Sequence, residues 1–200
     1  MYVTLYLSLV VFVIVSTISP GGATTLATAS GAHFGFKRTI PFMIGIALGL
    51  ATMGASSAIG LGSILIAMPS LKWFMKIVGS LYLLWLAWKT MQLGSPQLSR
   101  NLYKPTGVMG AIFLVWHNPK GWVMALSAAA SFADLTHSPI ILGAIIGTFF
   151  CIAALFSLSF WCSLGLLLSK CMKSDKQWNI FNFALGAMLA LSMVPMWLYE

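Results

Sequence analysis

The stretch PFMIGIALG at residues 41–49 recurs as PIILGAIIG at residues 139–147, 98 positions further along the chain. Each copy has a proline followed by glycines four and eight residues later: Pro41, Gly45 and Gly49 in the first, and Pro139, Gly143 and Gly147 in the second. Glycines four residues apart lie on one face of a helix, where they let a second helix approach closely. The pattern predicts two related halves with close helix packing, either within one chain or between two copies in a homodimer.

The composition around these copies is that of a protein surrounded by lipid. The 200 residues are 60% hydrophobic and 7% charged, which leaves almost nothing for a solvated domain. A bilayer core of about 30 Å takes roughly 20 apolar residues as helix, and barrel-type alternation is missing. The sequence predicts an all-α integral membrane protein with six transmembrane helices, near residues 4–34, 40–67, 71–93, 108–133, 139–168 and 178–198.

Two proline motifs, Ser19-Pro20-Gly21-Gly22 and Asn118-Pro119-Lys120-Gly121, fall inside the first and fourth predicted spans. Their prolines lie 99 residues apart (20 to 119), nearly the offset of the glycine pattern. This indicates one transmembrane domain over 1–200, made of three-helix repeats at about 1–97 and 105–200. Because three is odd, the second copy enters the membrane from the opposite side. We predict an inverted repeat with helices 1 and 4 broken at proline, as in many secondary transporters.

The basic residues gather in short connections between apolar runs, which favours membrane topology over a nucleic-acid partner. Three clusters hold most of them: Lys37 and Arg38; Lys89, Arg100 and Lys104; and Lys170, Lys173 and Lys176. By the positive-inside rule, connections 1–2, 3–4 and 5–6 face the cytoplasm of a bacterial inner membrane, and the C-terminus faces outward. The N-terminus faces outward if the first segment spans, and inward if that segment lies on the cytoplasmic face.

The proline breaks predict a polar site inside the membrane. A proline within a helix has no N–H and clashes with the carbonyl one turn earlier, so it leaves carbonyls free. In a membrane these are tolerated only beside protein or a wet cavity. One half-helix then ends in carbonyls suited to an ammonium, and the next begins with N–H groups suited to a carboxylate. These poles predict a zwitterion site formed by Ser19, Pro20, Gly21, Gly22, Thr24, Asn118, Pro119 and Lys120.

Two side chains near the second break are candidates for a special role. Lys120 places a full charge near the membrane midplane, which indicates function, with snorkelling or carbonyl capping as the alternative. His117 is a candidate to carry a coupling proton, and a neutral imidazole bound to free carbonyls is the equally weighted alternative. The acidic residues Asp134, Asp175 and Glu200 all lie at predicted membrane edges. The sequence predicts no metal site and no cofactor.

Several motifs follow one another in a recognisable order: SPG at 19–21, GF at 35–36, GIALG at 45–49, GLG at 60–62, GSLYLLWLAWK at 79–89 and NPK at 118–120. In this order and spacing they resemble the LysE/RhtB family of amino-acid exporters over nearly the whole chain. The stretch 82–89 looks most like the branch that exports cysteine and O-acetylserine. The family usually has Pro-Gly-Pro at the first break, whereas this chain has Pro20-Gly21-Gly22. The missing proline bears on gating geometry and substrate preference.

The resemblance implies a transporter, not an enzyme, whose substrate is an amino acid. It would export small neutral amino acids or derivatives, of the cysteine/O-acetylserine, threonine/homoserine or leucine type, by alternating access, with proton antiport as one form of coupling. Two alternatives are a thiol/disulfide electron-transfer protein and a non-transporting membrane assembly subunit. The first needs a cysteine near each break, and Cys151, Cys162 and Cys171 lie elsewhere. The second predicts no flux.

Overall fold

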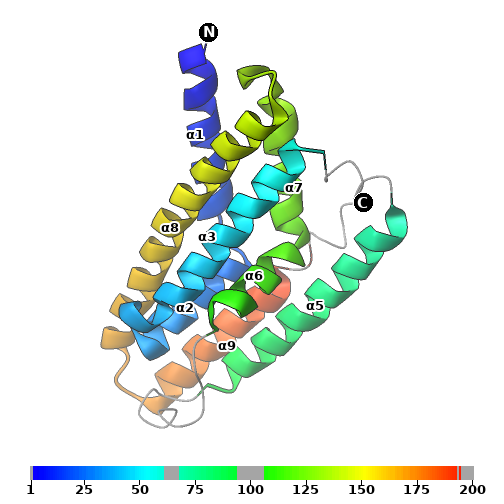
Figure 1. Ribbon diagram of the computed structural model, residues 1–200. Helices are drawn as coiled ribbons and strands as arrows, with labels where there is room; N and C mark the ends of the chain where they lie inside the picture. The colour runs from blue at the N-terminus through cyan, green and yellow to red at the C-terminus, as the bar shows by residue number, and fades with distance from the viewer. Residues whose placement is uncertain (1, 61–67, 94–105, 193, 195–200) are drawn as a thin grey trace.

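Every regular element in the described part of the chain is helical (Figure 1). A computed structural model describes residues 2–60, 68–93, 106–192 and 194. The α-helices are α1 (Tyr2–Ile18), α2 (Gly22–Phe34), α3 (Phe36–Ala58), α5 (Pro69–Met91), α6 (Val108–Trp116), α7 (Pro119–Ser131), α8 (Pro139–Cys171) and α9 (Asp175–Leu191). A short 3-10 helix, η1 (Ala133–Leu135), lies between α7 and α8. The prediction of an all-helical fold is confirmed for these residues.

Length and hydropathy identify the helices that are able to cross a membrane. The helices α3 and α8, with 23 and 33 residues, are each long and apolar enough to cross a membrane. The bent pair α1 and α2 is long and apolar enough when the two helices are taken together as one span. This gives up to three spans in the described chain, while the prediction of six stays a prediction. The predicted span ends at 61–67 and 195–198 lie outside the described residues, as do Arg100, Lys104 and the family motif positions Leu61 and Gly62.

The junction between α2 and α3 is a single residue, Gly35. Its φ of 79° lies in the left-handed region that favours glycine. The chain therefore reverses at once, and α3 begins at Phe36 rather than near residue 40, where the sequence placed the second span. Serine caps begin two later helices. The Ser138 hydroxyl accepts from the Ile141 N–H at the start of α8, and Ser174 and Gln177 form a capping box at the start of α9.

The helices α3 and α8 pack side by side in the middle of the bundle and run in opposite directions (Figure 1). Glycines on α8 allow this contact. A Cβ atom added to Gly147 would lie 2.8 Å from the Ala51 carbonyl oxygen, and one added to Gly143 would lie 3.0 Å from that of Ala55. Since backbone atoms cannot withdraw as a flexible side chain can, larger residues at these glycines would push the two helices apart.

The other glycine pair faces a different neighbour. A Cβ atom on Gly45 would overlap the Val108 carbonyl oxygen of α6, and one on Gly49 would lie 3.2 Å from the Val115 Cβ atom. Both pairs therefore make close approaches within one chain. Each of the four glycines that were predicted to pack helices therefore lies against another helix of the same chain.

The contacts between helices follow a regular scheme. α2 packs on α8 and α7 packs on α3, while α1 also contacts α8 and α6 contacts α3. α5 packs on α9. Exchanging α1 for α6, α2 for α7, α3 for α8 and α5 for α9 leaves this set of contacts unchanged. In Figure 1, α3 and α8, and likewise α5 and α9, run in opposite directions.

The described members of the three basic clusters lie at one end of the bundle. The α2–α3 junction, the α8–α9 junction and the C-terminal end of α5 share the lower end in Figure 1, while the N-terminus and the α7–α8 junction lie at the upper end. The lower end carries Lys37 and Arg38 in the first turn of α3, Lys89 in the last turn of α5, and Lys170 in the last turn of α8. The described members of the three basic clusters thus share one end.

Candidate functional site

The chain bends by 59° between α1 and α2, where Pro20 separates the two helices. Three residues, from 19 to 21, are not helical, and α2 begins at Gly22. Proline has no N–H to donate one turn back, so the last carbonyls of α1 need hydrogen-bond donors from elsewhere. Their partners define the site.

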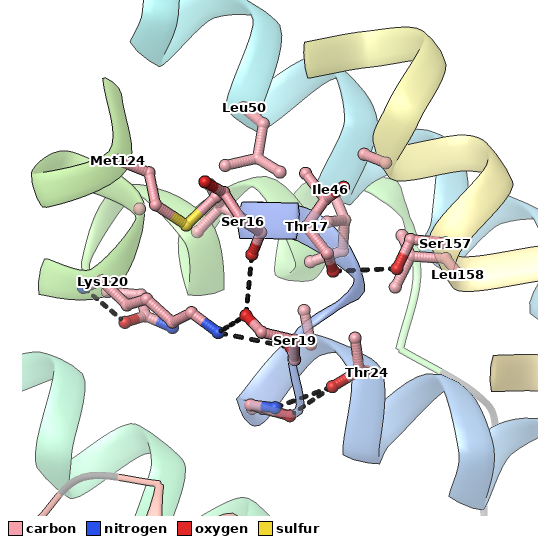
Figure 2. Close-up of a pocket in the computed structure, with 17 residues that line it drawn as sticks. Ser16, Thr17, Ser19, Thr24, Ile46, Leu50, Lys120, Met124, Ser157 and Leu158 are labelled. Carbon is pink, nitrogen blue, oxygen red and sulfur yellow. Dashed lines mark hydrogen bonds between the residues drawn. The ribbon is translucent and has the colours of Figure 1, made fainter. Parts of the chain in front are cut away.

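Side chains of α8 and of Ser19, which follows α1, satisfy three of these carbonyls. The Ser19 hydroxyl donates to the Ser16 carbonyl at 2.9 Å, and the Ser157 hydroxyl donates to the Thr17 carbonyl at 2.8 Å (Figure 2). The Trp161 indole N–H donates to the Ile18 carbonyl at 3.1 Å. The broken end of α1 is therefore held against α8 by hydrogen bonds from Ser157 and Trp161.

Lys120 satisfies the carbonyls that follow. Its Nζ atom lies 2.8 Å from Ser19 Oγ and 3.3 Å from the carbonyl oxygens of Ser19 and Pro20. Because the Ser19 hydroxyl proton already points to Ser16, Ser19 Oγ accepts from Lys120, as both carbonyls do. Three acceptors around one nitrogen match the three hydrogens of the ammonium form. Lys120 thus binds as a cation at the carbonyl end of α1, where the helix dipole also favours positive charge.

The first turn of α2 faces the same place with the opposite polarity. Thr24 Oγ1 accepts from the Gly21 N–H at 2.8 Å and donates to the Gly21 carbonyl at 2.9 Å, which fixes the turn that starts the helix. The N-cap residue is Gly21, which has no side chain to cap the N–H groups that follow. First-turn N–H groups have no acceptor within their own helix. They form a positive pole beside the carbonyl pole of α1.

The second interruption separates α6 from α7. α6 ends at Trp116, and α7 begins at Pro119, a position where proline fits a helix start. The Asn118 side-chain oxygen caps α7 by accepting from the Lys120 N–H at 3.0 Å, and the Trp122 indole donates to the Trp116 carbonyl at 2.8 Å. The Lys120 side chain extends from the start of α7 toward the end of α1 (Figure 2).

A cavity of about 60 Å³ lies where the two interruptions meet. It has several times the space that one water molecule needs. Small and hydroxylated residues from both halves of the chain surround it (Figure 2). They are Ser16, Thr17, Ser19, Gly21, Gly22, Ala23, Thr24, Ile46, Leu50, Val115, Asn118, Lys120, Gly121, Met124, Ala154, Ser157 and Leu158. Among these described residues, Lys120 alone has an ionisable side chain.

Most of the residues proposed from the sequence lie around this cavity. Ser19, Gly21, Gly22, Thr24, Asn118 and Lys120 line it, whereas Pro20 and Pro119 shape the breaks and do not belong to the lining. His117 lies outside the lining. Its Nδ1 donates to the Phe113 carbonyl of its own helix at 2.9 Å, and its ring stacks on Phe113. The Phe113 carbonyl also accepts from the backbone N–H of His117 at 3.1 Å, so the break does not free it, and both roles considered for His117 stay predictions.

Other polar residues were not expected from the sequence. Ser16, Thr17 and Ser157 line the cavity, but no proline or glycine motif points to them. A second buried polar pair joins α2 to α9, because His33 Nε2 lies 2.6 Å from Asn182 Oδ1. The Asn182 amide also donates to the Leu93 carbonyl, so its oxygen faces the imidazole and His33 Nε2 is the donor. Nothing close to either residue in the sequence indicates a pair 149 positions apart.

An apolar bundle of helices with a polar cavity at two helix interruptions is typical of a multi-pass membrane protein. The chain belongs to the LysE type translocator family, which matches residues 14–194.

The chain is also similar to curated membrane proteins. It is 27% identical over 122 residues to the cysteine/O-acetylserine efflux proteins of Salmonella typhimurium and Salmonella typhi, which is 60% of this chain and 62% of each relative. It is 25% identical over 144 residues to an uncharacterized membrane protein of Vibrio cholerae, 68% of both chains. The chain thus matches less than two thirds of the length of the efflux proteins. No solved structure matches it.

Proposed function

We propose that this protein is a secondary transporter that exports small neutral amino acids or their derivatives from the cytoplasm. The observation that carries the proposal is the convergence of three groups on one cavity: the carbonyl end of α1, the N–H end of α2 and the ammonium of Lys120. A zwitterion needs one negative and one positive pole, and a broken helix presents both without a second charged side chain. The family and the efflux relatives support the same class of function.

The charge of the site favours neutral substrates over basic ones. The described lining holds one cation and no carboxylate. An amino acid with an uncharged side chain does not change the net charge of the site. A lysine or arginine substrate would bring a second cation into a medium that screens charge poorly. The small size of Gly21, Gly22 and Gly121 and the hydroxyls of Thr17 and Ser157 suit short, polar side chains. Cysteine and O-acetylserine, which the relatives' names contain, fit this description.

We further propose that the two halves form an inverted repeat of six spans. The exchange of α1, α2, α3 and α5 for α6, α7, α8 and α9 preserves the most extensive helix contacts, and the central pairs run in opposite directions. Broken helices of both halves contribute to the cavity, as expected for transporters that alternate access around a midplane site. The basic end would face the cytoplasm of the bacterial inner membrane and the C-terminus the outside.

The thiol alternative receives less support. All three cysteines are free, and none lines the cavity: Cys162 is buried on α8, Cys151 is half-buried and Cys171 is exposed. A dithiol carrier needs two sulfur atoms that approach one another.

Efflux from proteoliposomes tests the proposed function. Vesicles containing the purified protein are loaded in turn with labelled cysteine, O-acetylserine, threonine, leucine and lysine, with and without a pH gradient. We expect faster loss of the small neutral compounds than from protein-free vesicles, and little loss of lysine. A rate increase on imposing the pH gradient would support proton antiport. Equal, background-level flux of every compound would contradict export and favour the assembly-subunit alternative.

A further inference from the structure

The three acceptors around Lys120 form a complete binding site for one primary ammonium group. Ser19 Oγ and the carbonyls of Ser19 and Pro20 all lie within 3.3 Å of one nitrogen. This is the arrangement that the α-ammonium group of an amino acid requires, and it lies at the border of the cavity. The protein therefore fills an ammonium site with a side chain of its own.

We propose that Lys120 is a tethered stand-in for the substrate ammonium, which pairs the carbonyls of the broken helix when the carrier is empty and gives them up when substrate binds. The inference rests on the proposed export function and deepens it. The stem of Lys120 has four flexible carbons, so the head group is able to leave these acceptors and face the carboxylate of the incoming substrate. The charge of the site then stays paired in both states.

The proposal explains how an empty carrier is able to return across the membrane. Alternating access closes the site once with substrate and once without it. Closing over unpaired carbonyls costs free energy, because buried acceptors lose water and gain no partner. Lys120 removes that cost from the empty return step. The substrate ammonium removes it from the loaded step.

If Lys120 has this role, Lys120→Ala should affect net efflux and substrate exchange to different extents. Exchange of external for internal substrate uses only the loaded carrier, whereas net efflux also needs the empty carrier to return. Because Lys120→Ala also removes the cation that faces the substrate carboxylate, exchange should need a higher substrate concentration than in wild type. At saturating substrate, loss of charge-assisted hydrogen bonds in the closing empty site should lower net efflux by about tenfold or more, and exchange should fall much less than net efflux. Lys170→Ala, an exposed lysine in the last turn of α8, is the matched control and should leave both rates unchanged.

A binding measurement tests the cation site without transport. Truncation to alanine removes three methylenes and the ammonium, so propylammonium has the dimensions of the missing part. We expect propylammonium to raise the thermal unfolding temperature of purified Lys120→Ala and to leave that of wild type unchanged, since the wild-type site is filled. Tetramethylammonium carries the same charge but has no N–H to donate, and it should have no effect on either protein. Propylammonium should also restore net efflux by the variant.

The outcomes separate this inference from the proposed function. Absence of a propylammonium effect on the folded variant, or equal loss of exchange and net efflux, overturns the stand-in role even when the wild type exports amino acids. Stabilisation of the variant by propylammonium supports the cation site even when no amino acid moves, and in that case the proposed export function fails. Lys120→Met serves as the second variant if Lys120→Ala does not fold, because it keeps the length of the apolar stem.

Discussion

Gly22 occupies the position where the family resemblance leads one to expect proline, and its surroundings admit that residue. It is the first residue of α2, where proline fits, and Gly21 before it is extended, with φ −175° and ψ −173°. A Cβ atom on Gly22 would lie 3.1 Å from Leu83 Cδ2 and 3.4 Å from Leu189 Cδ1, both ends of flexible side chains. The site therefore tolerates a ring at this position after small shifts.

We predict that Gly22→Pro folds and is more stable than wild type by up to about 1 kcal/mol, because proline restricts the unfolded chain. Thermal unfolding of the purified variant measures this effect. Gly22→Val is the control, since its branched side chain brings more atoms toward Leu83 without the ring that fixes φ, and it should be less stable. A large loss of stability in Gly22→Pro would mean that Leu83 and Leu189 are unable to move aside for the proline ring.

A second prediction at this scale concerns the carbonyl partners of α1. Ser157→Ala removes the hydroxyl that donates to the Thr17 carbonyl, and a buried acceptor without a partner costs about 1–3 kcal/mol. We expect a lower unfolding temperature and slower efflux. Ser159→Ala is the matched control on the same helix, because the Ser159 hydroxyl has a weak 4.0 Å contact with the Met43 sulfur. Equal effects of the two substitutions would argue against the role of Ser157.

The sequence revealed the parts of the site that depend on local chain chemistry. Proline and glycine mark Pro20 and Gly21 because they change the backbone itself, and Lys120 stands out because a charge is rare in an apolar run. Ser157 and Trp161 could not be found in this way. Serine and tryptophan are ordinary in membrane helices, and these two matter only because the crossing of α8 brings them to the end of α1.

At the scale of the helices, the crossing of α2 and α8 depends on two glycines. A Cβ atom on Gly31 would overlap the Cys162 carbonyl oxygen, and one on Gly165 would overlap that of Thr28. The two helices thus touch backbone to backbone over nearly one turn. The sequence pattern pointed instead to Gly45, Gly49, Gly143 and Gly147, since Gly31 and Gly165 do not repeat at the shared offset.

We predict that Gly165→Ala lowers stability by about 1–3 kcal/mol, because a methyl group there forces the helix backbones apart. Gly107→Ala is the control, since nothing described lies within 4 Å of a Cβ atom at that position. Thermal unfolding of both variants compares them directly. The result would contradict the tight crossing if the two substitutions had the same effect.

The link between α2 and α9 gives a prediction of a different kind. Asn182 is fully buried, and its side chain connects His33 to the Leu93 carbonyl. Asn182→Leu should cost several kcal/mol, because it leaves the His33 N–H and the Leu93 carbonyl without their partner. The double variant with His33→Leu should recover part of the loss, since the imidazole no longer needs an acceptor. Additive losses in a double-mutant cycle would show that the pair is not coupled.

At the scale of the whole molecule, the distribution of charge predicts an orientation in the membrane. The described basic clusters lie at the end that holds the α2–α3 and α8–α9 junctions, and the α7–α8 junction lies at the opposite end. Lysine and arginine are retained on the cytoplasmic side during insertion, so this end should face the cytoplasm. The six-span count and the orientation are the parts of the fold that depend on the bilayer, which is why helix packing alone does not decide them.

Cysteine labelling measures this orientation, because the chain carries an exposed thiol at the basic end. Cys171 ends α8 and is exposed, whereas Cys162 is fully buried. In a Cys151→Ala background, a membrane-impermeant maleimide should label Cys171 in inside-out vesicles and not in intact cells. His137→Cys, placed in the exposed α7–α8 junction of a variant that also carries Cys171→Ser, should show the reverse. Detergent-solubilised protein controls for reactivity. Labelling of Cys171 in intact cells would show that the orientation is the opposite of the predicted one. An amino acid from the cytoplasm would then have to enter the cavity from the other end of the bundle.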